Sequence, residues 1–398
     1  TFYNLACELM EDNPAAAAAA NAFLQSTAGT ILKGQLGYYL GSYYFRQEKY
    51  AEAAEAFNQA TVGNLNNNQV ATMQFQHGYS LFSQKQYSSA KPLLNSVRQS
   101  EASPYYVDAN YYYGLIAFND KNYKEALDAF KIARKNSRYE PLVPYYSSAI
   151  NYSIGEKEKS MQEAEAALKS SNSAFKTELL QLLGHAYFEK GNYAKAREYL
   201  QQYVNAAGKV KREDLYELAY CYYIEKQYPK AIEQFKPLAG GDDSLSQHAM
   251  YLLGDAYLKT NQKANARNAF LFCSTNSSNP LYKEISLFQF GKLSYELGFD
   301  NEALNALQQY VAGYPKGKYI EESRDLLVAV LANTSNYKES LELYESLPSK
   351  SENAKKQFPR IAFNRAQELL NDRKTTEAEK LLKQVIAAPY NNDVKSLA

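Results

Sequence analysis

The fold is decided by one stretch, Leu182-Leu183-Gly184-His185-Ala186-Tyr187-Phe188-Glu189-Lys190-Gly191-Asn192-Tyr193-Ala194-Lys195-Ala196-Arg197-Glu198-Tyr199-Leu200. It predicts two short amphipathic helices around a turn at Gly191-Asn192. Gly184 lies in the middle of the first helix, where glycine normally weakens the helix, so we expect another helix to pass close to it. Ala196 and Leu200 follow on one face of the second helix. We therefore expect a helical hairpin whose closest contact is made at Gly184 and Ala196.

The same hairpin recurs along the chain. We call the small residue in the first helix of each hairpin its anchor, and the anchors are Cys7, Gly41, Gly78, Gly114, Ser148, Gly184, Ala219, Gly254, Gly291, Val328 and Ala366. Twelve residues after the anchors stand small residues: Ala19, Ala53, Ala90, Ala126, Ser160, Ala196, Ala231, Ala266, Ala303, Ser340 and Ala378. Sixteen after them stand Phe23, Phe57, Leu94, Phe130, Ala164, Leu200, Phe235, Phe270, Leu307, Tyr344 and Leu382. One register shared by eleven units predicts a repeat array.

This pattern of Leu-Gly, then Tyr, then Ala-x3-Phe, at a period near 34, resembles the tetratricopeptide repeat family. The resemblance covers about residues 1–388, although the tryptophan of the family is absent because the chain contains none. It implies an all-α fold: a right-handed superhelical solenoid of antiparallel helix-turn-helix repeats. Each unit of such an array packs only on its neighbours, so a long chain need not divide into compact domains.

We expect residues 1–398 to form a single solenoid of about eleven hairpins. Residues 1–35 form a weak first repeat, 36–280 regular repeats, 281–388 looser repeats, and 389–398 a truncated tail. Neither end carries a clearly polar capping helix, which indicates either an excerpt from a longer array or ends that a partner covers. The first residue is Thr1 rather than Met, so we expect a processed or trimmed chain.

The composition excludes several classes of function. There are 44 basic and 43 acidic residues, and no basic stripe that would suit nucleic acid. No apolar run reaches membrane-spanning length, so no membrane insertion is expected. Cys7, Cys221 and Cys273 are too few for a disulfide or metal framework, and we interpret them as buried small residues.

No catalytic constellation is visible, so we expect neither an enzyme nor a cofactor. His77, His185 and His248 have no second ligand at metal-binding spacing, which leaves no metal site. A glycine-rich phosphate loop and a Gly-x-Ser-x-Gly motif are both absent from the sequence.

One row of residues does suggest a site. In the family, the residue three positions before the anchor faces the concave groove, and here that residue is aromatic in eight of ten hairpins. We predict a partner-binding row, which we call the aromatic row, at Tyr38, Phe75, Tyr111, Tyr145, Tyr216, Tyr251 and Phe288. In the remaining hairpins the same position holds Gln181, Asp325 and Phe363. Two interpretations stay open, a ligand-binding ladder and packing that seals the seam between repeats.

The resemblance implies a non-catalytic scaffold that binds a protein or an extended peptide in its concave groove. Alternatives are a carbohydrate-binding module, which the lack of tryptophan disfavours, and a regulatory arm of a larger enzyme or envelope assembly, with further repeats or domains in a longer chain. Tyr310-Val311-Ala312-Gly313-Tyr314-Pro315 is similar to repeats of the outer-membrane-associated branch of the family. This similarity favours the bacterial periplasm or cell envelope, with the cytoplasm as the alternative.

Overall fold

The computed structural model describes residues 2–26, 29–63, 65–170 and 173–390, together with residues 394 and 397. The described residues form 22 α-helices and one short 3-10 helix, η1, and include no strand. The predicted all-α repeat fold is therefore confirmed. Contacts between Cα atoms divide the chain into two compact units, Thr1–Ala186 and Tyr187–Ala398, with the boundary inside α11.

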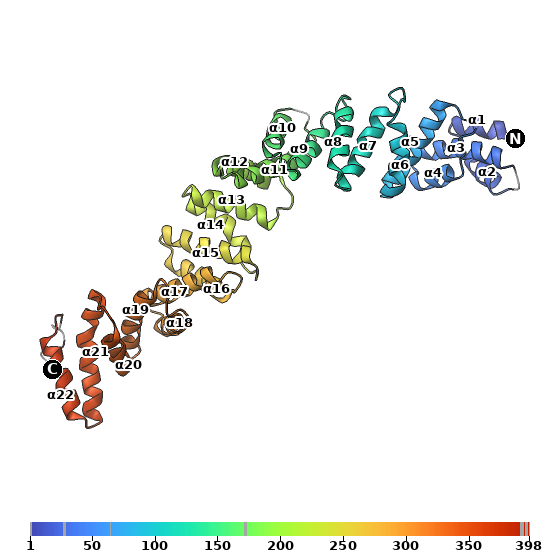
Figure 1. The fold of residues 1–398 in the computed structure, drawn as a ribbon. Coiled ribbons are helices and arrows are strands. Elements are labelled where there is room, and N and C mark those ends of the chain that lie inside the picture. The colour runs from blue at the N-terminus through green and yellow to red at the C-terminus, as the bar shows by residue number, and fades with distance from the viewer. Residues whose placement is uncertain are drawn as a thin grey trace. The chain divides into compact units, whose positions relative to one another are not determined.

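In unit 1, antiparallel helices pair into hairpins, from α1 with α2 to α9 with α10, and each hairpin packs on the next. Figure 1 shows these hairpins following one another along the blue-to-green part of the ribbon. The helices are α1 (Phe2–Met10), α2 (Pro14–Leu24), α3 (Thr30–Arg46), α4 (Tyr50–Asn58), α5 (Asn67–Ser83), α6 (Tyr87–Val97), α7 (Tyr106–Asn119), α8 (Tyr123–Ala133), α9 (Val143–Ser153), α10 (Lys157–Lys169) and α11 (Lys176–Glu189).

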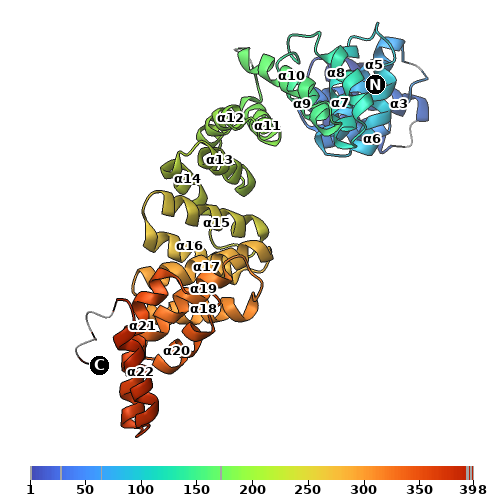
Figure 2. The same ribbon diagram turned by 60° about the vertical axis from the view of Figure 1, so that its left-hand side comes forward.

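In unit 2, α12 packs on α13, and hairpins continue from α13 with α14 to α21 with α22. Figure 2 shows the hairpins from α15 to α22 in succession. The helices are α12 (Tyr193–Ala206), α13 (Arg212–Ile224), α14 (Tyr228–Phe235), η1 (Lys236–Leu238), α15 (Ser244–Lys259), α16 (Lys263–Thr275), α17 (Pro280–Glu296), α18 (Asp300–Gly313), α19 (Ile320–Asn333), α20 (Tyr337–Ser346), α21 (Glu352–Asn371) and α22 (Thr375–Ala387).

The small residue twelve positions after the anchor lies where the two helices of a hairpin meet. This residue has no exposed surface in ten hairpins, at Ala53, Ala90, Ala126, Ser160, Ala196, Ala231, Ala266, Ala303, Ser340 and Ala378. Where it is serine, its hydroxyl donates a hydrogen bond to the backbone carbonyl of the anchor, over 2.7 Å from Ser160 to Ser148 and 2.8 Å from Ser340 to Val328. The side chain at this position therefore points directly at the facing backbone, and the predicted register is confirmed in these hairpins.

The anchor glycines are needed because a large side chain lies against them. A Cβ atom added to Gly114 would lie 2.7 Å from the ring of Phe130, and one added to Gly254 would lie 2.8 Å from Phe270. In both hairpins the contacting residue is the one sixteen positions after the anchor. The sequence predicted the closest contact with the small residue at position twelve. The glycine in fact accommodates the large residue at position sixteen, while the small residue accommodates the anchor's carbonyl.

The turn inside each hairpin contains a residue in the left-handed region of backbone space, seven positions after the anchor in ten hairpins. Only three of these residues are glycine, and the set is Glu48, Lys85, Lys121, Gly155, Gly191, Lys226, Asn261, Gly298, Ser335 and Arg373. The sequence predicted a glycine in this turn only at Gly191. In seven of the ten hairpins the turn residue is not glycine, and its side chain makes this backbone conformation less favourable.

Replacing Lys121 by glycine should therefore stabilise the protein by about 1 kcal/mol, because glycine adopts the φ of 59° without strain. The matched control is Lys131→Gly, an exposed lysine inside α8, where glycine should destabilise by about 0.5–1 kcal/mol. Urea unfolding of both variants, followed by circular dichroism, should show shifts of opposite sign. Shifts of the same sign would mean that the turn carries no backbone strain.

The first hairpin departs from the predicted register. Its left-handed turn residue is Asp12, only five positions after Cys7, so the second helix begins two residues early. Ala17 is buried and Ala19 is exposed, so Ala17 occupies the small position that we had assigned to Ala19. Cys7 is exposed, contrary to the prediction.

Cys221 and Cys273 are buried as predicted. The predicted continuity of one array over residues 1–398 stays a proposal. Most of the predicted tail, residues 391–393, 395, 396 and 398, lies outside the described residues.

Candidate functional site

The first helices of successive hairpins form the face that carries the aromatic row. In unit 1, α3 contacts α5 and α5 contacts α7, and in unit 2, α13 contacts α15 and α15 contacts α17. Among the described residues, the second helices of neighbouring hairpins make no comparable contact. We call the side of each unit on which the first helices contact one another the inner face.

Five of the seven residues in the aromatic row stack on a ring that enters from the next hairpin. The ring centroids lie 4.2–4.9 Å apart at interplanar angles of 1–34°, in the pairs Phe75–Tyr105, Tyr111–Tyr139, Tyr145–Phe175, Tyr251–Tyr282 and Phe288–Tyr319. In every pair, the second ring belongs to the residue nine positions before the anchor of the next hairpin. These stacks close the seam between adjacent hairpins.

The members of the aromatic row differ in burial. Phe75, Tyr111 and Phe288 are only 6%, 7% and 1% exposed, so a ligand could reach them only if the seam opened. The remaining members keep part of the ring at the surface: Tyr38, Tyr145, Tyr216 and Tyr251. The row therefore combines three buried residues with four that keep accessible surface, of which Tyr145 and Tyr251 also stack at a seam.

Tyr216 and Tyr38 do not stack on a ring nine positions before the next anchor. Tyr216 instead hydrogen-bonds through its hydroxyl to Nδ1 of His248, over 2.8 Å, and His248 stacks on Tyr282 at 4.6 Å. Tyr38 faces a seam in which Gln69 stands at the position that carries a ring elsewhere.

Unit 2 carries a continuous strip of aromatic side chains on α13, α15 and α17. We call it the tyrosine strip, and it consists of Tyr216, Tyr220, His248, Tyr251 and Tyr282. Each ring has a neighbour in the strip at a centroid distance of 4.6–6.0 Å, and each is partly exposed. Three successive first helices therefore present one connected aromatic surface.

The tyrosine strip is uncharged at neutral pH. Burial lowers the pKa of His248, so its imidazole is neutral, and burial also raises the pKa of the phenols of Tyr216 and Tyr251. The Tyr223 hydroxyl, at the C-terminal end of α13, donates to Asp255 over 2.7 Å. The strip thus offers apolar rings that carry hydroxyl groups, and the carboxylate of Asp255, which acts on Tyr251, already accepts a hydrogen bond from Tyr223.

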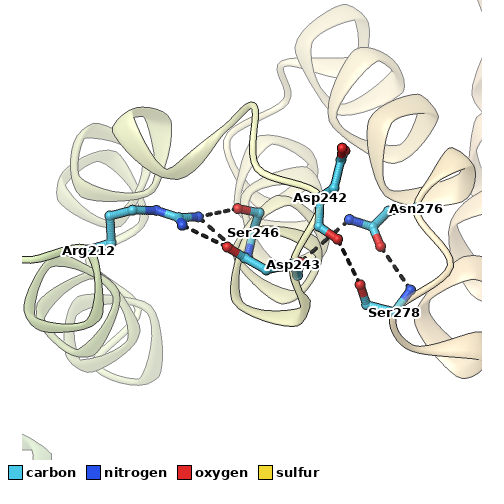
Figure 3. Close-up of polar contacts among 6 residues, drawn as sticks. All are labelled: Arg212, Asp242, Asp243, Ser246, Asn276 and Ser278. Atoms are coloured by element: carbon cyan, nitrogen blue, oxygen red, sulfur yellow. Dashed lines mark hydrogen bonds and ion pairs between the residues drawn. The ribbon is translucent and has the colours of Figure 1, made fainter.

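A polar network fixes the turns that precede α15 and α17 (Figure 3). Arg212 forms an ion pair with Asp243 at 2.7 Å and hydrogen-bonds to Ser246. Asp243 caps α15 by accepting the backbone N–H of Ser246, and the Ser278 hydroxyl donates to the carbonyl of Asp242. The hydrogen bond from Arg212 lowers the pKa of Asp243 to about 2. These contacts hold the helices of the tyrosine strip in a fixed register.

Sequence reasoning missed the rings that pair with the aromatic row. Their signal was present: nine residues before the anchor stand Tyr105, Tyr139, Phe175, Tyr282 and Tyr319. The role of these rings becomes clear only when neighbouring hairpins are packed against each other, because each ring contacts the hairpin before its own.

The described parts of the chain contain no group of three or more His, Cys, Asp or Glu side chains placed to hold a metal ion. Among these residues, no helix is both long enough and apolar enough to span a bilayer. Burial raises the pKa of Cys221 to about 12 and that of Cys273 to about 11, so both thiols stay protonated and unreactive.

Comparison with known proteins identifies the repeat. The sequence profile of the tetratricopeptide repeat matches residues 75–141 and 182–244, and a second profile of the same repeat matches residues 248–271. No curated protein sequence matches the chain.

Three solved structures are similar to parts of the chain. A tetratricopeptide repeat protein from Parabacteroides merdae covers 66% of this chain and 99% of its own, with 17% identity and a TM-score of 0.38. PilF of Pseudomonas aeruginosa covers 64% of this chain and 96% of its own, with 14% identity and a TM-score of 0.28. The TPR2AB domain of yeast Sti1 in complex with pHSP90 covers 69% of this chain and 98% of its own, with 15% identity and a TM-score of 0.34. Residues 75–141, 182–244 and 248–271 are therefore tetratricopeptide repeats, and their register of buried small residues recurs in ten hairpins of the chain.

Proposed function

We propose that the chain is a non-catalytic protein-interaction scaffold that binds a peptide or protein partner on its inner face. Within the aromatic row, Tyr38, Tyr145, Tyr216 and Tyr251 contact the partner. The remaining members, Phe75, Tyr111 and Phe288, hold adjacent hairpins together and so fix the spacing of the exposed rings.

The observation that carries this proposal is the tyrosine strip. Its five rings contact one another across three helices, yet each keeps part of its surface in water. Connected aromatic surface on a rigid support is costly to leave wet and is the kind of surface that dominates binding energy in protein interfaces. Tyrosine suits such a surface because its ring buries apolar area while its hydroxyl retains a hydrogen bond.

The charge of the strip indicates the kind of partner. Burial keeps His248 neutral and the phenols of Tyr216 and Tyr251 protonated, so these residues carry no charge that could pair with a phosphate or a carboxylate cluster. Apolar or aromatic side chains flanked by backbone amides match the strip best. The partner is therefore a segment that lays uncharged side chains across the inner face of α13, α15 and α17.

The test is selection of binding peptides from a displayed random library on the full chain, followed by affinity measurement on variants. The double substitution Tyr216→Ala with Tyr251→Ala should weaken binding of the selected peptides at least about 30-fold, equivalent to about 2 kcal/mol for one good hot spot. The control is Tyr337→Ala, a part-buried tyrosine in α20 that lies outside the strip. Peptides that bind the double variant and the wild type equally would place the interaction elsewhere.

A further inference from the structure

The seam between α3 and α5 lacks the aromatic ring that closes the next seam, between α5 and α7, where Tyr105 stacks on Phe75. The two positions that deliver a ring elsewhere, nine and six residues before the anchor, are occupied here by Gln69 and Thr72. Gln69 Oε1 accepts the backbone N–H of Asn66 at 3.0 Å, and the Thr72 hydroxyl donates to the carbonyl of Asn68 at 2.8 Å. Both side chains are committed to the start of their own helix, so neither closes the seam beside Tyr38.

A hollow of about 190 Å³ lies at this seam. Its lining includes Tyr38, Ser42, Arg46, Gln69, Thr72 and Gln76. For comparison, an apolar cavity of about 150 Å³ is large enough to hold a benzene ring. The hollow is therefore wide enough for the one aromatic side chain that this seam lacks.

One buried polar atom lines the hollow without a partner. Gln76 is 8% exposed, and its Oε1 accepts no hydrogen bond from any described residue. The buried Ser42 hydroxyl, by contrast, interacts with the hydroxyl of Tyr38. A buried polar atom left unpaired lowers stability, so such atoms are rare in folded proteins. Gln76 Oε1 can only accept a hydrogen bond, so the group missing from the hollow is a hydrogen-bond donor.

The hollow carries no net charge. Its single cationic side chain, Arg46, forms an ion pair with Asp12 at 2.8 Å and also donates to the carbonyl of Leu9. No charge remains to be neutralised by an anionic ligand. An uncharged ring that bears a hydroxyl group fits the size, the polarity and the charge of the hollow.

We propose that this hollow receives a tyrosine side chain of the bound partner. The partner's ring stacks on Tyr38, as Tyr105 stacks on Phe75 in the next seam, and its phenol O–H donates to Gln76 Oε1. The inference rests on the proposed function in that the occupant belongs to a protein. It uses residues of unit 1 alone, so its test is separate from that of the tyrosine strip in unit 2.

The probes are N-acetyl-L-tyrosinamide and its O-methyl ether, which differ only in the phenol O–H. Titration of each into the ¹⁵N-labelled full chain, followed by heteronuclear NMR, should give saturable shifts of the Gln76 side-chain amide and the Ser42 backbone amide. Loss of one hydrogen bond should make the ether bind at least about fivefold more weakly. Equal affinity of the two probes would overturn the proposed hydrogen bond, and no saturable shift of either residue would overturn the site.

Three variants separate binding from folding. Gln76→Met should lose the preference for the phenol and bind N-acetyl-L-tyrosinamide and its O-methyl ether equally well, as measured by the shift of the Ser42 backbone amide. It should also raise the midpoint of thermal unfolding, because it removes a buried amide oxygen that has no hydrogen bond. Gln69→Tyr should fill the hollow from within and block both probes. The matched control is Gln74→Met on the same helix, where Oε1 already accepts a hydrogen bond from Ser96 at 3.0 Å, and it should retain the preference.

The outcomes distinguish this inference from the proposed function. If Gln76→Met lowers the midpoint and keeps the preference, Gln76 is a structural residue and the proposal is wrong. If neither probe binds while selected peptides still depend on Tyr216 and Tyr251, the scaffold function stands and the hollow holds only solvent.

Discussion

Replacing Tyr111 by alanine is expected to lower the free energy of unfolding of unit 1 by about 3–5 kcal/mol. Tyr111 is 7% exposed, stacks on Tyr139 at 4.2 Å and also contacts the ring of Phe130, which has no exposed surface. Alanine would leave a cavity between two hairpins and remove a stacked pair. Because the chain contains no tryptophan, urea unfolding is best followed by far-ultraviolet circular dichroism.

The control is Tyr106→Ala in the same helix. Tyr106 is partly exposed, and the described aromatic pairs include no contact of its ring, so its loss should cost about 1 kcal/mol or less. Tyr111→Phe should recover most of the stability, since it keeps the stacked ring. If Tyr111→Ala were as stable as Tyr106→Ala, the seam would not depend on the stack, and Tyr111 would be free to serve as a ligand-binding residue.

The two open interpretations of the aromatic row thereby receive separate tests. Tyr111→Ala should act mainly on stability. Tyr216→Ala, at the same helical position but with its ring partly exposed, should cost less stability and more affinity for a partner. A sequence pattern treats these two residues as equivalent because they share one position relative to the anchor. Only the packing of the following hairpin distinguishes them.

The hairpin architecture could be predicted because its constraints are local. The spacing from Gly114 to Ala126 to Phe130 lies within one hairpin, and each of these residues has a single role that limits its size. The left-handed turn could not be predicted at Lys121 or Glu48, because a strained backbone leaves no compositional trace when packing holds it in place.

Contacts between hairpins were harder to predict. The stack of Phe288 on Tyr319 joins residues 31 positions apart in two hairpins, so its register depends on how the hairpins rotate against each other. The hollow beside Tyr38 was equally hidden, since it depends on the direction of the Gln69 side chain as well as on its identity. The early turn at Asp12 shifted the first hairpin by two residues for a related reason: the alanine run in α2 offers several equivalent faces.

Replacing Ala231 by leucine should destabilise unit 2 by about 3 kcal/mol, at the upper end of the range for overpacking. Ala231 has no exposed surface and stands twelve residues after its anchor, Ala219. At this position in two other hairpins, a serine hydroxyl reaches the anchor's carbonyl at 2.7 and 2.8 Å. The space beyond Cβ therefore ends at the backbone of the facing helix. Leucine carries three more carbon atoms, which that backbone can accommodate only if α14 separates from α13.

Two further variants test this geometry. Ala231→Ser should cost within about 1 kcal/mol, because Ser160 and Ser340 show that a hydroxyl fits and hydrogen-bonds at this position. Ala239→Leu, at an exposed residue after η1, should shift the unfolding midpoint far less than Ala231→Leu. Equal midpoints for the two leucine variants would show that Ala231 does not lie at the contact between the two helices. If serine proved as damaging as leucine, added volume would not be the cause, and the position would be limited by the polarity of its side chain.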